Sequence, residues 1–329
     1  MSHAPSAPSA APAPRAAAAR TRRPAVVTAA SAAALLALAA CGSESSDDVA
    51  AETETITVTH AQGEEEVPLE PQRVVVHDLS VLDTLSQLDV EVVGVPDFDF
   101  AEQLPEYADV ATVGTLHEPD VEAVAALDPD LIIVAARSSS SYDALSEVAT
   151  TIDMSVDSTD FLPSARERVT TLGEIFGQEA AVEERFEALD AMAQETSDLA
   201  ADAGTALIVM TIAGEVSVYG AGSRFNLLYD ELGYTPADPD IPEASHGDVV
   251  SFEYIAETDP DHLFVMDRDQ IIGDGATSAE QVLDNPLVNG TTAVQEGQVA
   301  YLDPFAWYLA PSGLGSLETM VSEVNATVT

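Results

Sequence analysis

Short runs of consecutive apolar residues alternate along the chain with stretches in which apolar residues recur every three or four positions. Continuous runs are typical of parallel strands covered on both faces, and the wider spacing is typical of helices that bury one side. The runs that predict strands are 55–59, 73–77, 90–95, 206–211, 216–219 and 299–302. Because helical stretches separate several of them, the pattern predicts the α/β fold class.

One helix–turn–strand pattern occurs twice. Residues 120–134 and 251–265 each contain a helical stretch, an Asp-Pro-Asp turn and a continuous apolar run. Pro129 and Pro260 end the two helices, because proline cannot continue one. The copies lie 131 residues apart (251 − 120). The pattern predicts one unit in each of two α/β lobes; the alternative is that a common turn recurs by chance.

A long helical region lies between the two copies. The Ser-Ala-Arg-Glu motif at 164–167 matches a capping box and predicts a helix start. Apolar residues at helical spacing predict a second helix over 179–203, about 35 Å long, which is enough to join two lobes. The predicted domains are therefore an N-terminal α/β lobe (55–163), a connecting helical region (164–203) and a C-terminal α/β lobe (204–329).

The first forty residues have the pattern of an export signal. They contain four Arg and no acidic residue, and they end in an apolar run at 25–40 that is shorter than the roughly 20 residues a membrane span needs. The sequence Leu38-Ala-Ala-Cys41 is similar to a bacterial lipobox, which implies cleavage before Cys41 and lipid attachment to its sulfur; the alternative is a coincidental Cys. Residues 41–54 are rich in Ser, Asp and Glu and predict a flexible tether. The export route, Sec or Tat, stays open.

The chain is strongly acidic. Its 11 basic residues are all Arg, against 58 acidic ones, and without residues 1–40 the balance is 7 − 58 = −51. Such a charge argues against nucleic-acid partners and against an anionic membrane surface, so any membrane contact is expected through the lipid alone. The single Cys excludes a disulfide framework and a Cys-rich metal site.

Few positive side chains remain after residue 40, and their positions are informative. Arg166, Arg168 and Arg185 lie on the helical region, where acidic neighbours three or four residues away can pair with them. Arg137 and Arg268 each lie three residues beyond a strand of the repeat, at the edge where open α/β sheets bind ligands.

A further Arg lies in a glycine-containing loop. Arg224 is part of the sequence Tyr-Gly-Ala-Gly-Ser-Arg-Phe at 219–225. Arg137, Arg224 and Arg268 together would suit an anionic, oxygen-rich ligand in a cleft between the lobes. The alternative is three separate surface ion pairs.

Loop-like segments carry His246 and Tyr308, two further candidate ligand-binding residues. Ser245, His246 and Asp248 are too close in sequence to form a catalytic triad, and no Gly-x-Ser-x-Gly motif is present. The sequence also lacks a zinc-binding His or Cys pair and a complete dinucleotide fingerprint. We therefore expect no enzyme and no intrinsic cofactor.

Five segments are specific enough to indicate a family: Gly-Thr-Leu-His-Glu-Pro-Asp at 114–120, Tyr-Gly-Ala-Gly-Ser-Arg-Phe at 219–225, Glu-Ala-Ser-His-Gly at 243–247, Val-Ser-Phe-Glu-Tyr-Ile-Ala at 250–256 and Tyr-Leu-Asp-Pro-Phe-Ala-Trp-Tyr at 301–308. Through them, residues 56–320 resemble the class III substrate-binding lipoproteins of ferric-siderophore ABC importers, and most of all those for catecholate siderophores, including petrobactin. The resemblance implies two lobes joined by a long helix, with the ligand cleft between them.

The resemblance also assigns roles to individual residues. It implies that Arg137, Arg224 and Arg268 hold an anionic ferric catecholate, and that His246 and Tyr308 complete the iron shell when the siderophore is tetradentate. Glu122 and Glu253, at equivalent repeat positions, are implied to dock on an ABC permease dimer that works with its ATPase. The expected protein is a monomer, exported and lipid-anchored at the outer face of the cytoplasmic membrane.

Three other functions compete with this one. A binder of haem or a cobalamin with the same fold would need no arginine triad. A surface hydrolase of siderophore esters would need a nucleophile and a base, for which the sequence shows no signature. A purely structural surface lipoprotein would leave the matched arginines unexplained. The extreme acidity suggests a salt-adapted surface, and the identity of the siderophore is not settled by the sequence.

Overall fold

The computed structural model describes residues 54–242, 247–272 and 277–329. The predicted signal peptide, the tether up to residue 53 with Cys41, and His246 lie outside the described residues. Within the described ranges, no helix has both the length and the apolar composition that crossing a bilayer requires.

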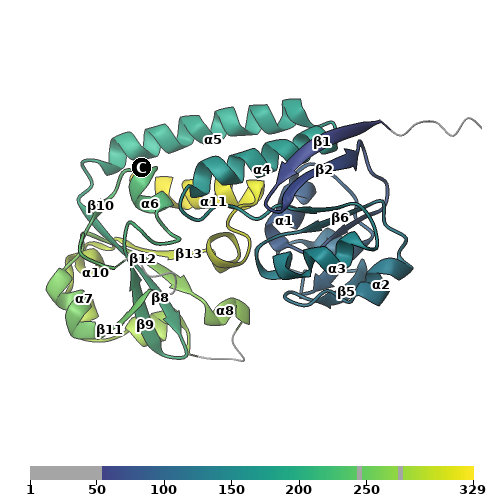
Figure 1. Cartoon of the computed structure of the whole chain (residues 1–329). Helices are drawn as coiled ribbons and strands as arrows, with labels where there is room; N and C mark the ends of the chain where they lie inside the picture. Colours follow the sequence, from purple (N-terminus) through teal and green to yellow (C-terminus); the bar gives the residue numbers. More distant parts are fainter. Residues whose placement is uncertain (1–53, 243–246, 273–276) are drawn as a thin grey trace, which may run out of the picture. The chain divides into compact units, whose positions relative to one another are not determined.

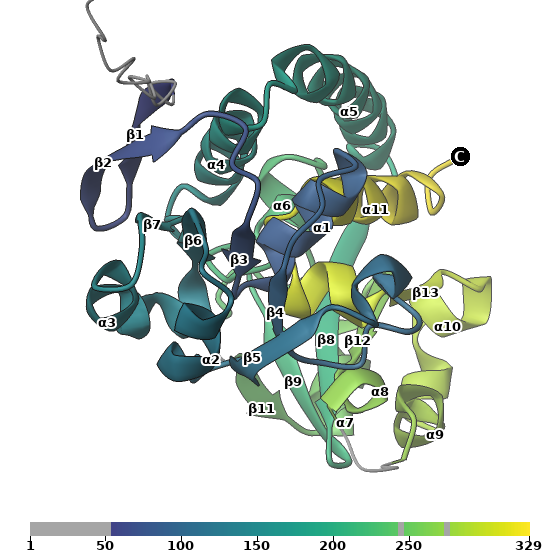
Figure 2. The same cartoon turned by 90° about the vertical axis from the view of Figure 1, so that its right-hand side faces the viewer.

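Five parallel strands form the sheet of the first lobe (Figure 2). In order across the sheet they are β5 (Ala111–Thr115), β4 (Gly94–Asp97), β3 (Val74–Val76), β6 (Leu131–Val134) and β7 (Thr151–Asp153). The helical segments of this lobe are α1 (Leu79–Gln87), η1 (Pro105–Tyr107), α2 (Val121–Ala126), η2 (Ala136–Ser141) and α3 (Tyr142–Ser146). Val74 and Val76 belong to one core cluster and Val75 to another, so the sheet is covered on both faces, as its continuous apolar runs predict.

The sheet of the second lobe combines parallel and antiparallel strands. Its main path is β11 (Asp248–Val250), β9 (Glu215–Tyr219), β8 (Thr205–Ile212), β12 (His262–Asp267) and β13 (Val299–Leu302), and β10 (Thr235–Pro236) pairs with β8. Its helical segments are α6 (Leu227–Asp230), α7 (Phe252–Thr258), α8 (Asp269–Ile272), α9 (Ala279–Leu283), η3 (Val288–Gly290) and α10 (Thr292–Glu296). Strand β12 is buried throughout, and its alternate residues again enter two different core clusters.

The strand prediction is wrong at one run and omits the second strand of a hairpin. The run at 90–95 forms a strand only from Gly94, because Val90 instead donates its backbone N–H to Leu85 and closes the end of α1. The hairpin of β1 (Thr55–His60) and β2 (Gly63–Pro68) is antiparallel, and its second strand contains three consecutive Glu residues that gave no apolar signal.

The repeat is confirmed, with one copy in each sheet. Helix α2 leads into β6, and α7 leads into β12. The first Asp of each turn has a positive φ, 48° at Asp128 and 45° at Asp259. The second Asp accepts backbone N–H groups at the start of the neighbouring parallel strand: Asp130 from Arg73 at 2.9 Å, and Asp261 from Thr205 at 2.7 Å. Each Asp-Pro-Asp turn therefore fastens the two central strands of its sheet together.

The connecting region contains two helices, α4 (Phe161–Ile175) and α5 (Glu179–Ala200), which run beside α1 and α11 (Leu314–Asn325) (Figure 1). The predicted capping box is wrong, since α4 begins before it and Ser164 lies inside the helix, where its hydroxyl accepts from the backbone N–H of Asp157. Pro163 is tolerated because first-turn N–H groups have no helical partner. Gly177, at φ 63°, separates the two helices.

Helix α11 is fastened to α1 of the first lobe. The buried carboxylate of Asp83 accepts the backbone N–H of Ser316 at 2.9 Å, at the start of α11. Gly313 and Gly315 leave the space for it, since a Cβ at either position would come within 2.2 Å and 2.8 Å of the Asp83 carboxylate oxygens. Gly313 and Gly315 therefore allow the Asp83 carboxylate to reach the start of α11.

Candidate ligand-binding site

Arg137 lies three residues after β6, where the strand order of the first sheet reverses. Turn η2, which carries it, is held by Ser138, whose buried hydroxyl donates to the carbonyl of His77 at the end of β3. The half-buried guanidinium donates to two backbone carbonyls, that of Leu309 at 3.1 Å and that of Tyr308 at 3.2 Å. This is the position at which open α/β sheets bind ligands.

Arg224 reaches the same carbonyl from the second lobe. It follows β9 in a tight turn in which the N–H of Ser223 donates to Gly220. The next residue, Phe225, is buried edge-on against Tyr219, with ring centroids 4.7 Å apart. Arg224 donates to the Tyr308 carbonyl at 3.1 Å, and its Cζ lies 4.7 Å from the centre of the Tyr308 ring.

Burial lowers the pKa of Arg224, and the nearby charges of Arg137 and Arg268 lower it further. A guanidinium nevertheless stays protonated, because its reference pKa is so high. The three guanidiniums lie close together because each contacts the ring or the carbonyl of Tyr308.

Arg268 completes the cluster. It follows β12, and its backbone N–H donates to Thr211 at the end of the adjacent strand β8. Its Cζ lies 5.1 Å from the centre of the Tyr308 ring. The buried Nε of Arg268 donates to no described residue, although buried donors are usually hydrogen-bonded.

Tyr308 lies where the two lobes meet. It belongs to the π-helical turn η4 (Phe305–Leu309), and its half-buried side chain packs against the core clusters of both lobes. Its carbonyl accepts from Arg137 and Arg224, and its ring faces Arg224 and Arg268. The structure thus brings together four of the five predicted ligand-binding residues; the fifth, His246, lies outside the described residues.

The alternative of three separate surface ion pairs is not supported. Among the described residues, the Arg side chains with a carboxylate within 4.0 Å are Arg166, Arg168 and Arg185. Their partners are not the predicted neighbours three or four positions away: Arg166 pairs with Asp190 on α5, Arg185 with Glu318 on α11, and Arg168 with the preceding residue, Glu167. Packing of adjacent helices, rather than spacing along one helix, supplies the acids for Arg166 and Arg185.

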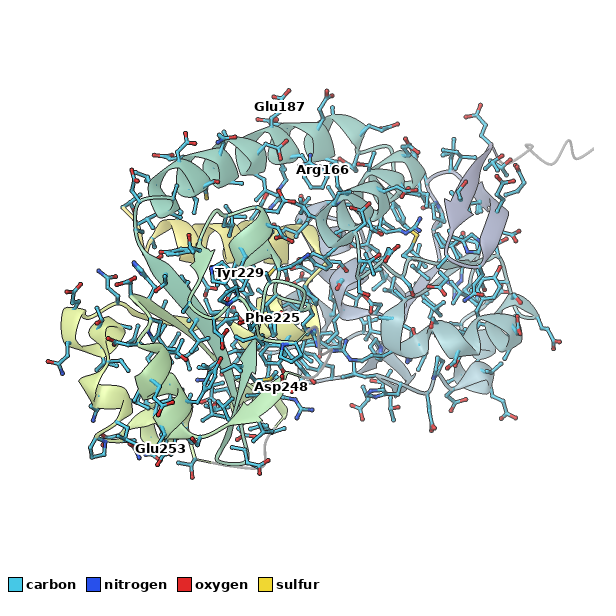
Figure 3. The ribbon with its side chains drawn as sticks, turned by 60° about the vertical axis from the view of Figure 1, so that its left-hand side comes forward. Arg166, Glu187, Phe225, Tyr229, Asp248 and Glu253 are labelled. Carbon is cyan, nitrogen blue, oxygen red and sulfur yellow. The ribbon has the colours of Figure 1, made fainter. Side chains whose placement is uncertain are left out.

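Glu122 and Glu253 occupy equivalent exposed positions, each in the first turn of its repeat helix. Figure 3 shows Glu253 at the outer end of the second lobe. Hydrogen bonds from its own backbone N–H and from Ser251 lower the pKa of Glu253, so it is charged at neutral pH. Asp120 caps α2 by accepting the N–H of Glu122 at 3.1 Å.

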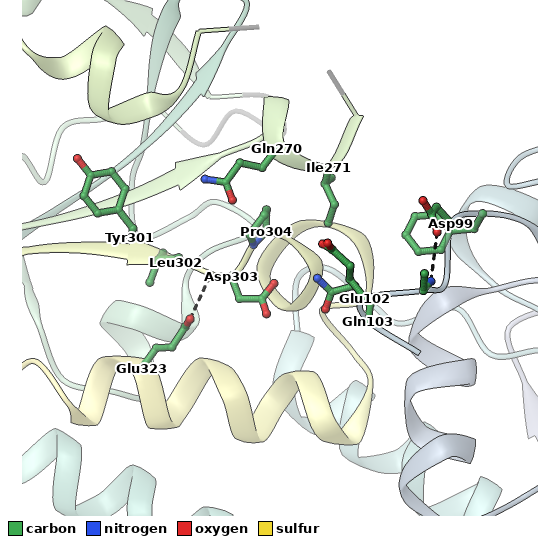
Figure 4. Close-up of a pocket in the computed structure, with 12 residues that line it drawn as sticks. Asp99, Glu102, Gln103, Gln270, Ile271, Tyr301, Leu302, Asp303, Pro304 and Glu323 are labelled. Carbon is green, nitrogen blue, oxygen red and sulfur yellow. Dashed lines mark hydrogen bonds between the residues drawn. The ribbon is translucent and has the colours of Figure 1, made fainter. Parts of the chain in front are cut away.

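An acidic cavity lies beside η4 (Figure 4). It has a volume of about 590 Å³, and its lining includes Asp99, Glu102, Asp303 and Glu323 but none of the three arginines. An anionic ligand would be repelled from it, so we place the candidate site at Tyr308 and not in this cavity. No group of three or more His, Cys, Asp or Glu residues suited to a metal ion occurs among the described residues.

The comparison with known families matches residues 74–306, from the first strand of the first sheet to the turn that carries Tyr308, to the periplasmic binding proteins. This match covers more than half of the chain. The chain belongs to the periplasmic binding protein family. The family assignment agrees with the two α/β lobes predicted from the repeat and described above.

Two relatives in the family resemble most of the chain. The petrobactin-binding protein YclQ of Bacillus subtilis is 39% identical over 292 residues, which cover 86% of this chain and 92% of YclQ. The ferric-anguibactin-binding protein FatB of Vibrio anguillarum is 30% identical over 277 residues, 82% of this chain and 86% of FatB.

Two solved structures are also similar to most of the chain. The crystal structure of the periplasmic catecholate-siderophore binding protein VctP from Vibrio cholerae has a TM-score of 0.78 and 37% identity, and the match covers 83% of this chain and 100% of VctP. The crystal structure of YclQ also has a TM-score of 0.78, with coverage of 84% and 99%. Both similarities extend over both lobes.

Proposed function

We propose that the protein captures a ferric siderophore of the catecholate type outside the cytoplasm and delivers it to an ABC importer. The observation that carries the proposal is the cluster of three guanidiniums around Tyr308, drawn from both lobes and unpaired with any described carboxylate. Relatives that bind petrobactin and catecholate siderophores support it.

The chemistry of the cluster suits this ligand. Fe(III) is a hard ion that prefers oxygen donors and also accepts imidazole. A ferric catecholate is anionic, so guanidinium groups would compensate its charge, each charge-assisted hydrogen bond contributing about 1.5–3 kcal/mol. We propose that Tyr308 and His246 occupy the two iron positions that a tetradentate siderophore leaves open.

A fluorescence titration tests the proposed function. Trp307 is the single Trp of the chain, is buried, and directly precedes Tyr308. Its emission should be quenched by a ferric catecholate at lower concentrations than by a ferric hydroxamate or haem. Tighter binding of haem would replace the proposal with the haem-binding alternative.

Replacing Tyr308 with Phe tests direct coordination of the iron. The charge-transfer absorption of the bound complex should shift with a tetradentate catecholate, because one oxygen donor is lost. A hexadentate siderophore already fills the iron shell, so its spectrum should stay the same and serves as the control. Identical spectra for both ligands would mean that Tyr308 only lines the site.

We further propose that Glu122 and Glu253 dock on the two subunits of the permease. The double variant Glu122→Ala with Glu253→Ala should keep the wild-type ligand affinity while siderophore-dependent iron import falls by roughly tenfold, since charges at an interface mainly control productive encounter. The exposed pair Glu183 and Glu187 on α5 offers a matched control with the same loss of charge. Normal import in the Glu122→Ala and Glu253→Ala double variant would contradict the docking role. The two residues would then only stabilise the first turns of their helices.

Export and anchoring are the remaining parts of the proposal. We propose that Cys41 carries the lipid that holds the protein, as a monomer, at the outer face of the cytoplasmic membrane. Cys41→Ala should leave the protein unprocessed or move it out of the membrane fraction. Membrane retention of a correctly cleaved variant would show that another anchor exists.

We also propose that the chain divides into an N-terminal lobe (55–163), a connecting helical region (164–203) and a C-terminal lobe (204–329).

A further inference from the structure

Turn η4 and the residues just before it are hydrogen-bonded to one carboxylate of α11. Glu323 accepts the backbone N–H of Asp303 at 3.0 Å through one oxygen and the indole N–H of Trp307 at 2.8 Å through the other (Figure 4 shows the first bond). Asp303 in turn accepts the N–H of Phe305 at 2.7 Å. The two oxygens of Glu323 thus bind the backbone two residues before the turn and the side chain at the middle of the turn.

Trp307 connects this contact with the arginine cluster in two directions. Along the chain it is followed by Tyr308, whose carbonyl accepts from Arg137 and Arg224. Across the core its ring lies 6.3 Å from that of Phe225, the residue next to Arg224. A change in the orientation of Trp307 would therefore move both the acceptor carbonyl and the segment that carries one of its donors.

Turn η4 is wider than an α-helical turn, and its geometry depends on contacts from outside the turn, such as those of Glu323. The N–H of Ala310 donates to Phe305 at 2.8 Å, five residues back, so the turn is wider than an α-helix. The carbonyls of Tyr308 and Leu309 at its end accept from arginine side chains. π-Helical turns of this kind are rare and often occur at functional sites.

We propose that Glu323 is a positioning residue for ligand binding: by holding Trp307 and Asp303, it sets the orientation of η4 and hence the geometry in which the three arginines meet an anionic ligand. The inference rests on the proposed function. Burial raises the pKa of Glu323, so its charged form costs stability.

The test compares two glutamates of the same helix. Glu323→Gln keeps the shape of the side chain but lets its amide accept with one atom in place of two. Glu318→Gln is the matched control, because Glu318 pairs with Arg185 and makes no hydrogen bond to η4. The affinity for a ferric catecholate, measured by calorimetry, should fall about 3- to 10-fold in Glu323→Gln and stay unchanged in Glu318→Gln.

Two further measurements separate positioning from general stability. The emission of Trp307 should shift in Glu323→Gln and not in Glu318→Gln, because only the first loses the indole acceptor. In a double-mutant cycle with Arg224→Ala, the affinity losses should be non-additive for Glu323→Gln and additive for Glu318→Gln, as expected when two residues act through one structure. Trp307→Phe, which removes the N–H donor and replaces the buried indole with a smaller phenyl ring, should lower the affinity at least as much as Glu323→Gln.

The outcomes distinguish this inference from the proposed function. If the wild-type chain binds no ferric catecholate, the proposed function fails and the role of Glu323 fails with it. If the wild type binds and Glu323→Gln binds equally well, or if its effect is additive with that of Arg224→Ala, the positioning role alone is overturned. Equal losses in Glu323→Gln and Glu318→Gln would likewise reduce Glu323 to a contributor to stability.

Discussion

Replacing Arg224 with Ala is expected to weaken the binding of a ferric catecholate by about 5- to 150-fold, which corresponds to one charge-assisted hydrogen bond of about 1–3 kcal/mol. Arg224 combines a hydrogen bond to the Tyr308 carbonyl with a position over the Tyr308 ring. Its loss removes positive charge and also an orienting contact of the turn. Calorimetric titration of the purified protein measures the change directly.

Arg166→Ala is the control for charge. Arg166 lies on α4, pairs with Asp190 and stacks over Phe186, with its Cζ 4.2 Å from the ring centre. Its removal changes the net charge by the same amount but touches no residue of the site, so affinity should stay within the error of the measurement. Unchanged affinity in single alanine variants of Arg137, Arg224 and Arg268 would disprove the role of the cluster.

Replacing Asp83 with Asn is expected to change how stability depends on pH. Burial raises the pKa of Asp83 to about 6, while the N–H groups of Ser316 and Gly315 act in the opposite direction. Because the folded pKa exceeds the ordinary value of 3.8, the folded state binds the proton more tightly than the unfolded chain. The stabilising contribution is therefore complete below about pH 4 and is lost as the pH rises through about 6, a change of about 3 kcal/mol.

Urea unfolding of both proteins at pH 4 and pH 7 measures this effect. The Asn side chain does not ionise, so the free energy of unfolding of Asp83→Asn minus that of the wild type should become more positive by about 2 kcal/mol between these pH values. Burial also raises the pKa values of Asp78 and Glu323. Their contributions to the pH dependence are the same in both proteins and therefore cancel in the difference. A difference that does not change with pH would mean that Asp83 is not buried in the way described.

The parts of the fold and site that could be predicted are those with a local signal. The Asp-Pro-Asp turns mark the ends of two helices and the starts of two buried strands, and these signals are independent of the rest of the fold. Arg137 and Arg268 were found because each lies three residues after the apolar run of its repeat copy, although β12 itself extends to Asp267. The glycine-rich loop likewise identified Arg224.

The remaining contacts join residues that are distant in sequence and leave no local pattern. Nothing in the periodicity of α11 relates Glu323 to Trp307, or Ser316 to Asp83, because these pairs arise from the packing of helices and turns. Short edge strands such as β7 and β11 were missed since three residues give no periodicity. The start of α4 was misplaced because Ser164 fits a capping motif equally well inside a helix.

The half-buried arginine cluster in so acidic a chain has a consequence for salt dependence. With 7 Arg against 58 acidic residues after position 40, the protein repels an approaching anion at long range and attracts it only at contact. Dissolved ions screen the long-range field beyond about 10 Å at 0.1 M but weaken short, partly buried interactions much less. Rising ionic strength should therefore increase the association rate constant for an anionic ligand, in contrast to an ordinary pairing of arginine with an anion, and stopped-flow quenching of Trp307 would show the sign of the slope.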